Sequence, residues 1–235
     1  MVARPRTLVA FAAAAAALAA CERTAPPRRI ESSLIAIDHE RVVVRTDVVG
    51  VDRFASRATF VIVDAQNRGD RDAEVTLGGV LVDADGQEVG TLRPESLHIP
   101  RRARRTFALV DRDRAERKTA TAARIDLRGA REPRFADPIT ITNGHIYPDG
   151  DRVVVVGMVK NTSDRACIAM VLAGFHDRDG RPMTRPFAAF ELGAGAERPA
   201  RFVGPDGSHA GYLFVGEITY CPRTGCDVEH VVPTL

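Results

Sequence analysis

Asn67-Arg-Gly-Asp-Arg71 is followed 94 residues later by Asn161-Thr-Ser-Asp-Arg165, so the chain repeats an Asn-x-x-Asp-Arg motif. The same spacing separates Asp83-Ala-Asp-Gly86 from Asp177-Arg-Asp-Gly180, with no gap between the two matches. A repeat of this length in only two copies is typical of a duplicated domain, because solenoid units are shorter and more numerous. The sequence therefore predicts two related domains.

The stretches around these motifs have the lengths and β-branched residues of strands, and turn formers separate them. In the first copy we expect strands at residues 41–49, 58–63, 75–82, 105–110 and 121–127. In the second copy we expect strands at residues 139–146, 152–159, 166–176, 200–203 and 212–220. Helical periodicity is nearly absent. The predicted fold class is all-β, with two tandem immunoglobulin-like β-sandwich domains of about 100 residues each.

The first 20 residues have the composition of an export signal. Arg4 and Arg6 precede a nearly continuous apolar run over residues 7–20. A signal peptide has an apolar region of roughly 7–15 residues, whereas a membrane-spanning helix needs about 20. The run therefore favours a cleaved signal, with an uncleaved anchor as the alternative.

Leu18-Ala-Ala-Cys21 at the end of this run resembles the lipobox of bacterial lipoproteins. The resemblance implies cleavage before Cys21 and lipidation of Cys21, with ordinary secretion as the alternative. Because each buried CH₂ contributes about 0.8 kcal/mol, several acyl chains would hold the protein on a membrane. We expect the bacterial cell envelope, at the outer membrane and facing the periplasm.

Composition divides the chain into five parts. We expect a signal peptide at 1–20, a lipidated tether at 21–31, a first domain at 32–130, a linker at 131–137 and a second domain at 138–235. Cleavage removes two of the 33 basic side chains and none of the 31 acidic ones, so the mature chain is neutral. A neutral chain has no general attraction for nucleic acid. The expected partners are the membrane, through Cys21, and a protein of the envelope.

The order of apolar strand, asparagine turn, apolar strand and Gly174-Phe-His-Asp-Arg-Asp-Gly180 resembles the FxLYD-type domain of bacterial envelope proteins. The resemblance covers residues 43–127 and 138–220, although the first copy has Val80-Leu-Val-Asp83 in place of an aromatic residue. It implies an immunoglobulin-like sandwich that serves as an interaction or spacer module. It brings no catalytic residues with it.

No motif predicts catalysis or a bound metal. In an EF-hand register the first and twelfth residues of the Asp-x-Asp-Gly loops would be unable to coordinate calcium, so these loops are predicted to be hairpin turns. The six histidines lack metal spacing and are expected at the surface or in hairpins: His39, His98, His145, His176, His209 and His230. Gly-x-Ser-x-Gly and phosphate-loop motifs are missing from the sequence. We therefore predict no catalytic residue, no cofactor and no metal site.

The basic run Arg101-Arg-Ala-Arg-Arg105 has two interpretations. It could bind an anionic partner such as a phosphate. It could also be a solvated strand edge, where charge discourages the addition of further strands. The neutrality of the mature chain favours the edge.

Three cysteines remain after Cys21: Cys167, Cys221 and Cys226. Four residues separate Cys221 from Cys226, a spacing that suits a disulfide across a turn. This pairing leaves Cys167 as the odd thiol. A redox pair, a zinc site that includes His230, and a bond from Cys167 are the alternatives.

These observations predict an envelope lipoprotein that acts as a non-catalytic protein-binding or scaffold module. The alternative is a carrier or accessory subunit that binds a small molecule or an acyl ligand in the cleft between the two domains. An enzyme is the third possibility.

Overall fold

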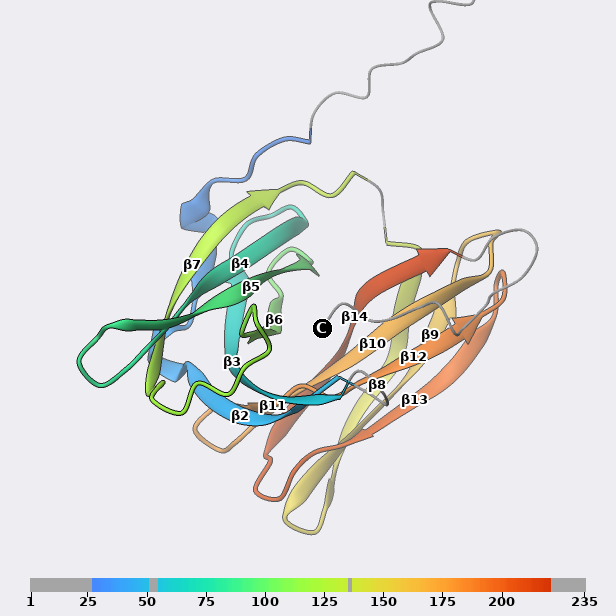
Figure 1. Cartoon of the computed structure of the whole chain (residues 1–235). Coiled ribbons are helices and arrows are strands. Elements are labelled where there is room, and N and C mark those ends of the chain that lie inside the picture. Colours follow the sequence, from blue (N-terminus) through green and yellow to red (C-terminus); the bar gives the residue numbers. More distant parts are fainter. Residues whose placement is uncertain (1–26, 51–54, 135–136, 221–235) are drawn as a thin grey trace, which may run out of the picture.

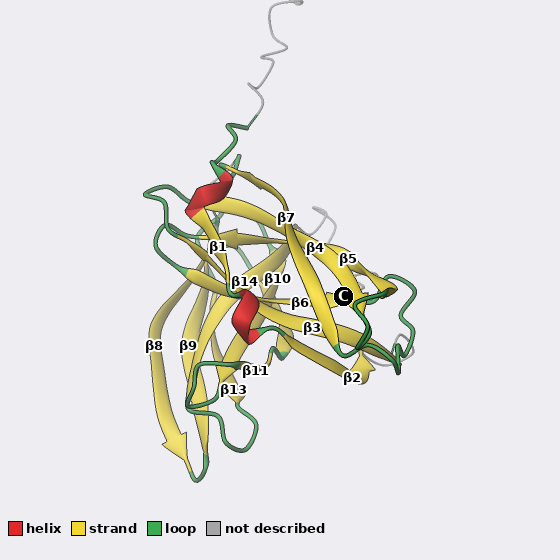
Figure 2. Ribbon diagram, turned by 90° about the vertical axis from the view of Figure 1, so that its left-hand side faces the viewer, coloured by secondary structure: helices red, strands yellow, loops and turns green. Residues whose placement is uncertain are grey.

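The computed structural model describes residues 27–50, 55–134 and 137–220, which form two tandem β-sandwich-like domains of four sheets (Figure 1). The first domain contains β1 (Ile35–Ile37), β2 (Val43–Val49), β3 (Ser56–Asn67), β4 (Ala73–Val82), β5 (Glu88–Ile99), β6 (Arg104–Val110) and β7 (Ala122–Arg131). The second contains β8 (Ile139–Asp149), β9 (Arg152–Asn161), β10 (Cys167–His176), β11 (Pro182–Thr184), β12 (Phe187–Leu192), β13 (Glu197–Val203) and β14 (Ala210–Tyr220). Among these residues the helices are two 3-10 turns, Ser32–Leu34 and His39–Arg41, drawn red in Figure 2.

Each domain contains two antiparallel sheets. In the first domain, β3 pairs with β1, β2 and β6, while β4 lies between β5 and β7. In the second domain, β9 lies between β8 and β13, while β10 pairs with β11, β12 and β14. The all-β prediction with two tandem sandwich-like domains is confirmed.

The repeated asparagines perform the same task in both domains. Asn67 Nδ2 donates to the carbonyl oxygens of Arg71 (2.7 Å) and Ile99 (3.1 Å). Asn161 Nδ2 donates to the carbonyl oxygens of Arg165 (2.7 Å) and Gly193 (3.0 Å). Both asparagines are fully buried, and each Oδ1 accepts from the backbone N–H two residues later. Each asparagine thus ties its own turn to a neighbouring strand end.

The two Asp-x-Asp-Gly loops are hairpin turns, as the sequence predicts. Asp83 Oδ1 accepts from the N–H groups of Asp85 (3.0 Å) and Gln87 (2.8 Å), and Asp177 Oδ1 makes the corresponding bonds at the same distances. Gly86 and Gly180 have φ of 77° and 74°, a region that glycine enters without steric cost. The aspartates therefore stabilise turns.

The short strand β1 and one further strand position in each domain were missing from the sequence prediction. β5 and the pair β11 and β12 lie at equivalent places in the repeat, paired with β4 and β10. Pro94 interrupts the pattern of β5, and Pro186 separates β11 from β12. Proline is tolerated at sheet edges and bulges, and the β4–β5 register shifts opposite Pro94. Sequence signals for these strands are weak for that reason.

The described end of the expected tether lies against the first domain. Ile30 N–H donates to the carbonyl of Ala130 (3.0 Å), and Glu132 N–H donates to that of Arg28 (2.8 Å). Residues 28–30 therefore run beside the end of β7.

Strand β10 is buried along its whole length. Because successive side chains of a strand point to opposite faces, the strand needs cover on both sides. One face belongs to the core of the second domain: Cys167, Ala169, Val171, Ala173 and Phe175. On the other face, Met170 and Leu172 pack into the core cluster of the first domain. The two sandwiches are thus packed face against face.

We expect Asn67→Ala and Asn161→Ala each to lower the free energy of unfolding by about 2–3 kcal/mol, because each leaves buried backbone groups without partners. Urea denaturation monitored by circular dichroism measures this. Asp70→Ala and Asp164→Ala, at exposed positions in the same turns, are the matched controls and should stay within about 0.5 kcal/mol. Equal effects at the four positions would contradict a special role for the asparagines.

Candidate functional site

Among the described residues, the most unusual combination of buried apolar and buried polar side chains lies at the interface between the two domains. Its apolar part includes Met170, Leu172 and Phe214 of the second domain. These side chains are buried in the same cluster as Phe107 and Leu109 of the first domain. Full burial of such a side chain contributes about 1.5–3 kcal/mol. The contact is thus strong enough to hold the two domains together.

A buried polar network lies beside this apolar contact. His176 Nε2 lies 2.8 Å from Asp64 Oδ2, and Thr106 Oγ1 donates to Asp64 Oδ1 at 2.6 Å. Thr106 Oγ1 also lies 2.8 Å from the hydroxyl oxygen of Tyr212. Asp64 and Thr106 come from β3 and β6 of the first domain, while His176 and Tyr212 come from β10 and β14 of the second. We call these four residues the interdomain network.

The directions of these hydrogen bonds follow from proton counting. Thr106 has one hydroxyl proton and donates it to Asp64, so the Tyr212 hydroxyl donates to Thr106. Burial raises the pKa of Tyr212 well above its usual range, and the charge of Asp64 raises it further. The phenol therefore keeps its proton and remains a donor.

The network is a structural contact. Asp64, Thr106 and His176 are at most 2% exposed, and none of them lines either of the two interdomain cavities described below. His176 lies at the strand end of the β10–β11 hairpin, as one alternative expected, but it is buried and not at the surface. Its partner lies 112 residues away in the chain, so no local pattern could indicate the contact.

Close packing accompanies the network. A Cβ atom on Gly174 would lie 2.7 Å from Thr106 Oγ1, closer than real Cβ contacts. Glycine at this position lets β10 approach β6 closely enough for the hydrogen bonds to form.

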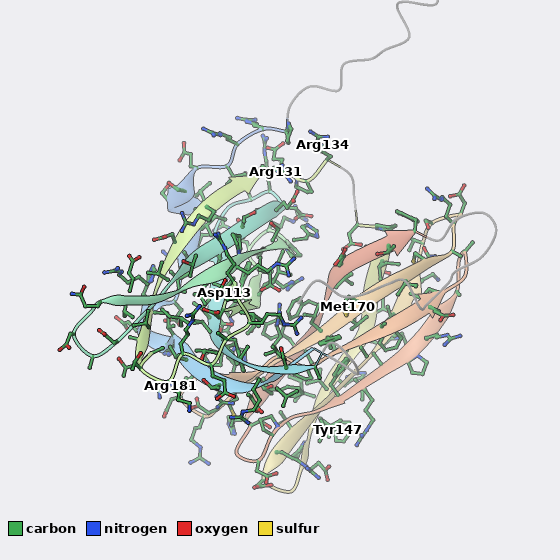
Figure 3. The ribbon with its side chains drawn as sticks, viewed as in Figure 1. Asp113, Arg131, Arg134, Tyr147, Met170 and Arg181 are labelled. Carbon is green, nitrogen blue, oxygen red and sulfur yellow. The ribbon has the colours of Figure 1, made fainter. Side chains whose placement is uncertain are left out.

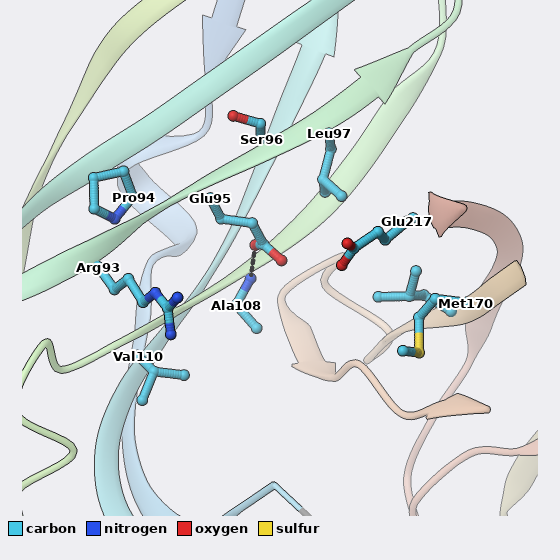
Figure 4. A pocket seen from close by; sticks show the side chains of 11 residues that line it. Arg93, Pro94, Glu95, Ser96, Leu97, Ala108, Val110, Met170 and Glu217 are labelled. Carbon is cyan, nitrogen blue, oxygen red and sulfur yellow. Dashed lines mark hydrogen bonds between the residues drawn. The ribbon is translucent and has the colours of Figure 1, made fainter. Parts of the chain in front are cut away.

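A first cavity, of about 340 Å³, opens between β5 and β6 on one side and β10 and β14 on the other (Figure 4). Glu95 reaches into it, with Oε2 accepting from the N–H of Ala108 (2.9 Å) and Oε1 from Arg185 Nη1 (2.7 Å). Arg185 stands between β11 and β12, and its side chain is 2% exposed. Glu95 therefore has partners from both domains, while Arg93 and Glu217 line the same cavity at exposed positions.

A second cavity, of about 460 Å³, also lies between the domains, beside the linker. His98 and Arg105 line it from the first domain, and Ile141, Leu213 and Phe214 line it from the second. The two cavities place ligand-sized volumes at the boundary between the sandwiches.

The basic run divides between surface and interface. Arg101 and Arg102 are exposed in the turn before β6, as expected for a solvated edge. Arg105 instead lines the second cavity, with its guanidinium 5.2 Å from the ring centroid of Phe214. Because side chains alternate along β6, Arg104 and Arg105 are expected on opposite faces. The face that carries Arg105 becomes a cavity wall only because the second domain packs against it.

Exposed apolar side chains gather at one end of the second domain. Tyr147 (40% exposed) and Val203 (37%) form what we call the distal apolar patch, whereas Ile146 (51%) lies on the opposite face of the same strand. Tyr147, Val154 and Val203 are register partners across β8, β9 and β13, so their side chains share one face of the sheet. Figure 3 shows Tyr147 at the end of the molecule away from Arg131 and Arg134.

The lipidation residue Cys21 and the disulfide residues Cys221 and Cys226 lie outside the described residues. Cys167 is a buried free thiol, and burial raises its pKa. Its register partner on β14 is Tyr220, the chain neighbour of Cys221. The rival bond from Cys167 therefore needs a direct test.

Other kinds of site were sought among the described residues. They contain no group of three or more His, Cys, Asp or Glu side chains that could hold a metal ion. None of their helices is long and apolar enough to cross a membrane.

Comparison with known proteins assigns no family. No family model matches the chain, and no curated protein matches it. Among solved structures, the tandem CBM22-1–CBM22-2 domain of Paenibacillus barcinonensis Xyn10C shares 8% identity over 89% of this chain and 96% of that chain. The TM-score is 0.13, so this similarity carries no argument about the present protein.

We expect Thr106→Val and Tyr212→Phe each to lower the free energy of unfolding by about 1–3 kcal/mol, because each breaks a buried hydrogen bond between the domains. The double variant should cost less than the sum, with a coupling of about 1 kcal/mol. Urea denaturation supplies the four free energies. Thr76→Val, which removes an exposed hydroxyl pair with Ser96, is the control, and strict additivity of the two interface changes would contradict the network.

Non-reducing peptide mapping should recover Cys221 and Cys226 in one linked peptide. Cys167 should react with iodoacetamide only after unfolding, because its thiol is buried. A linked peptide that contains Cys167, or stoichiometric zinc in the purified protein, would refute this assignment.

Proposed function

We propose that this protein is a lipid-anchored, non-catalytic binding module of the bacterial cell envelope. In this proposal Cys21 carries the acyl chains, the protein faces the periplasm from the outer membrane, and the domains are immunoglobulin-like sandwiches of the FxLYD type. Its partner is another protein of the envelope. The lipobox-like Leu18-Ala-Ala-Cys21 supports the anchor.

The distal apolar patch is the observation that carries the binding function. Tyr147 and Val203 are large apolar side chains on one face of the sheet that remain exposed in a chain with a separate, well-buried core. Contiguous apolar surface of this kind is typical of interaction sites. β8 is also the edge strand of its sheet, so its backbone can pair with an added strand.

The position of the patch suits a protein held by its N-terminal segment. The described chain begins at one end of the molecule, whereas the β8–β9 hairpin lies at the opposite end (Figures 1 and 2). An anchor at Cys21 would therefore leave the distal apolar patch facing away from the membrane. Rigid packing of the domains would keep it there.

Ligand binding between the domains is the second candidate function. The two cavities, of about 340 and 460 Å³, support it, because small-molecule sites have volumes of roughly 300–1,000 Å³ and favour domain boundaries. In this reading the protein is a carrier or accessory subunit.

Cys21→Ala should release the protein from membranes without unfolding it, because the acyl chains are the proposed anchor. Cell fractionation and labelling with a radioactive fatty acid measure this. The lipoprotein proposal would be contradicted if the Cys21→Ala protein still sediments with membranes and the wild-type protein takes up no label.

Tyr147→Glu should abolish the capture of the envelope partner, because a buried carboxylate at an apolar contact is costly. In-cell crosslinking followed by mass spectrometry identifies the partner and quantifies its recovery. Val48→Glu is the matched control, since Val48 is an apolar residue of the first domain that is 57% exposed. Equal recovery with Tyr147→Glu and wild type would overturn the assignment of the patch.

A further inference from the structure

The second cavity contains one cation, Arg105, that has no ion-pair partner among the described residues. Its one hydrogen bond among these residues runs from Nη1 to the carbonyl of its neighbour Arg104 (2.9 Å). Arg105 Nε is buried and has no acceptor. Desolvation lowers the pKa of this guanidinium, although Tyr212, Asp137 and Asp72 oppose the shift. Burial of a charged donor without an acceptor is costly, so the site favours an added acceptor.

The carboxylates of the same cavity are already engaged. Asp72 Oδ1 accepts from the N–H of Arg101, and Asp137 Oδ1 accepts from that of Ile139, both at 2.9 Å. Their Oδ2 atoms flank His98, at 3.3 Å from Nε2 and 3.7 Å from Nδ1. His98 Nε2 nevertheless has no hydrogen bond of good geometry. His98 thus lies between two carboxylates, and Arg105 Nε is the buried guanidinium donor of this cavity without an acceptor among the described residues.

The opposite wall of the cavity is apolar. It consists of side chains from β8 and β14 of the second domain: Ile139, Ile141, Leu213, Phe214 and Val215. The guanidinium of Arg105 lies over the ring of Phe214, which positions it at the boundary between the polar and the apolar wall. The cavity therefore combines a polar wall, in which Arg105 lies with Asp72 and Asp137, with an aliphatic surface.

We propose that this cavity binds a long-chain carboxylate, whose carboxylate accepts hydrogen bonds from Arg105 and whose acyl chain lies against Ile141 and Leu213. This inference rests on the second proposed function, ligand binding between the domains. It names the chemical class of the ligand and the residues that select it. Arginine suits the role because its hydrogen bonds to carboxylates are charge-assisted.

Isothermal titration calorimetry on the full-length mature chain with Cys21→Ala tests the proposal, with dodecanoate below its critical micelle concentration as the probe. One dodecanoate should bind per chain. Butanoate should bind much more weakly because it lacks the chain, and dodecyltrimethylammonium because it lacks the carboxylate. Arg105→Gln should weaken dodecanoate binding by about tenfold or more, since it removes the charged donor.

Two further variants separate the cavities. Ile141→Trp fills the apolar part of the second cavity and should also reduce binding, whereas Arg93→Gln changes an exposed arginine of the first cavity and should leave it unaltered. Melting temperatures identify any variant that fails to fold. Equal affinity for dodecanoate and the ammonium probe, or unchanged affinity in both Arg105→Gln and Ile141→Trp, would overturn the proposal.

Failure of the carboxylate site in the second cavity can be distinguished from failure of ligand binding between the domains. If Met170→Trp in the first cavity abolishes dodecanoate binding while Arg105→Gln and Ile141→Trp do not, this site assignment is wrong and ligand binding between the domains stands. If dodecanoate does not bind at all, the carboxylate site falls, whereas ligand binding between the domains with another chemistry and the test of the distal apolar patch are unaffected.

Discussion

Burial of β10 on both faces determines how the rest of the molecule is arranged. A strand whose two faces are both apolar is stable only between two covering layers. One layer is its own sandwich partner, and the other is the outer surface of the first domain. The duplicated domains therefore pack as one body, and everything that lies between them follows from this contact.

Apolar packing alone would allow the domains to slide, because the hydrophobic effect has no direction. The interdomain network adds directional contacts at the centre of the interface. The bonds from Asp64 to His176 and from Thr106 to Tyr212 form only when the second domain stands opposite the first in this alignment. Because a buried polar group without a partner is costly, other alignments of the domains are disfavoured. The network thus fixes the register in which the two sheets meet.

This fixed register also shapes the cavities and the outer surface. The first cavity contains the buried Arg185–Glu95 ion pair, which connects the domains and leaves little free charge in its depth. The second cavity keeps Arg105 without an ion-pair partner among the described residues. At the far end, the distal apolar patch lies outside the contact altogether. The proposed ligand site therefore lies within the interface between the domains, and the proposed protein-binding surface lies outside it.

The sequence by itself determined the duplicated all-β domains and the roles of the asparagine and aspartate turns, because those hydrogen bonds are local or repeat at one spacing. It missed the three-residue strand β1, and it missed β5, β11 and β12, where prolines at sheet edges and bulges blur the alternation of strands. Only the tertiary structure decided that His176 is buried and that Arg105 lines a cavity. Their surroundings come from the other domain, and a contact such as that of His176 with Asp64 spans 112 residues. No local pattern encodes a partner at that distance, since face-to-face packing of two domains depends on their whole surfaces.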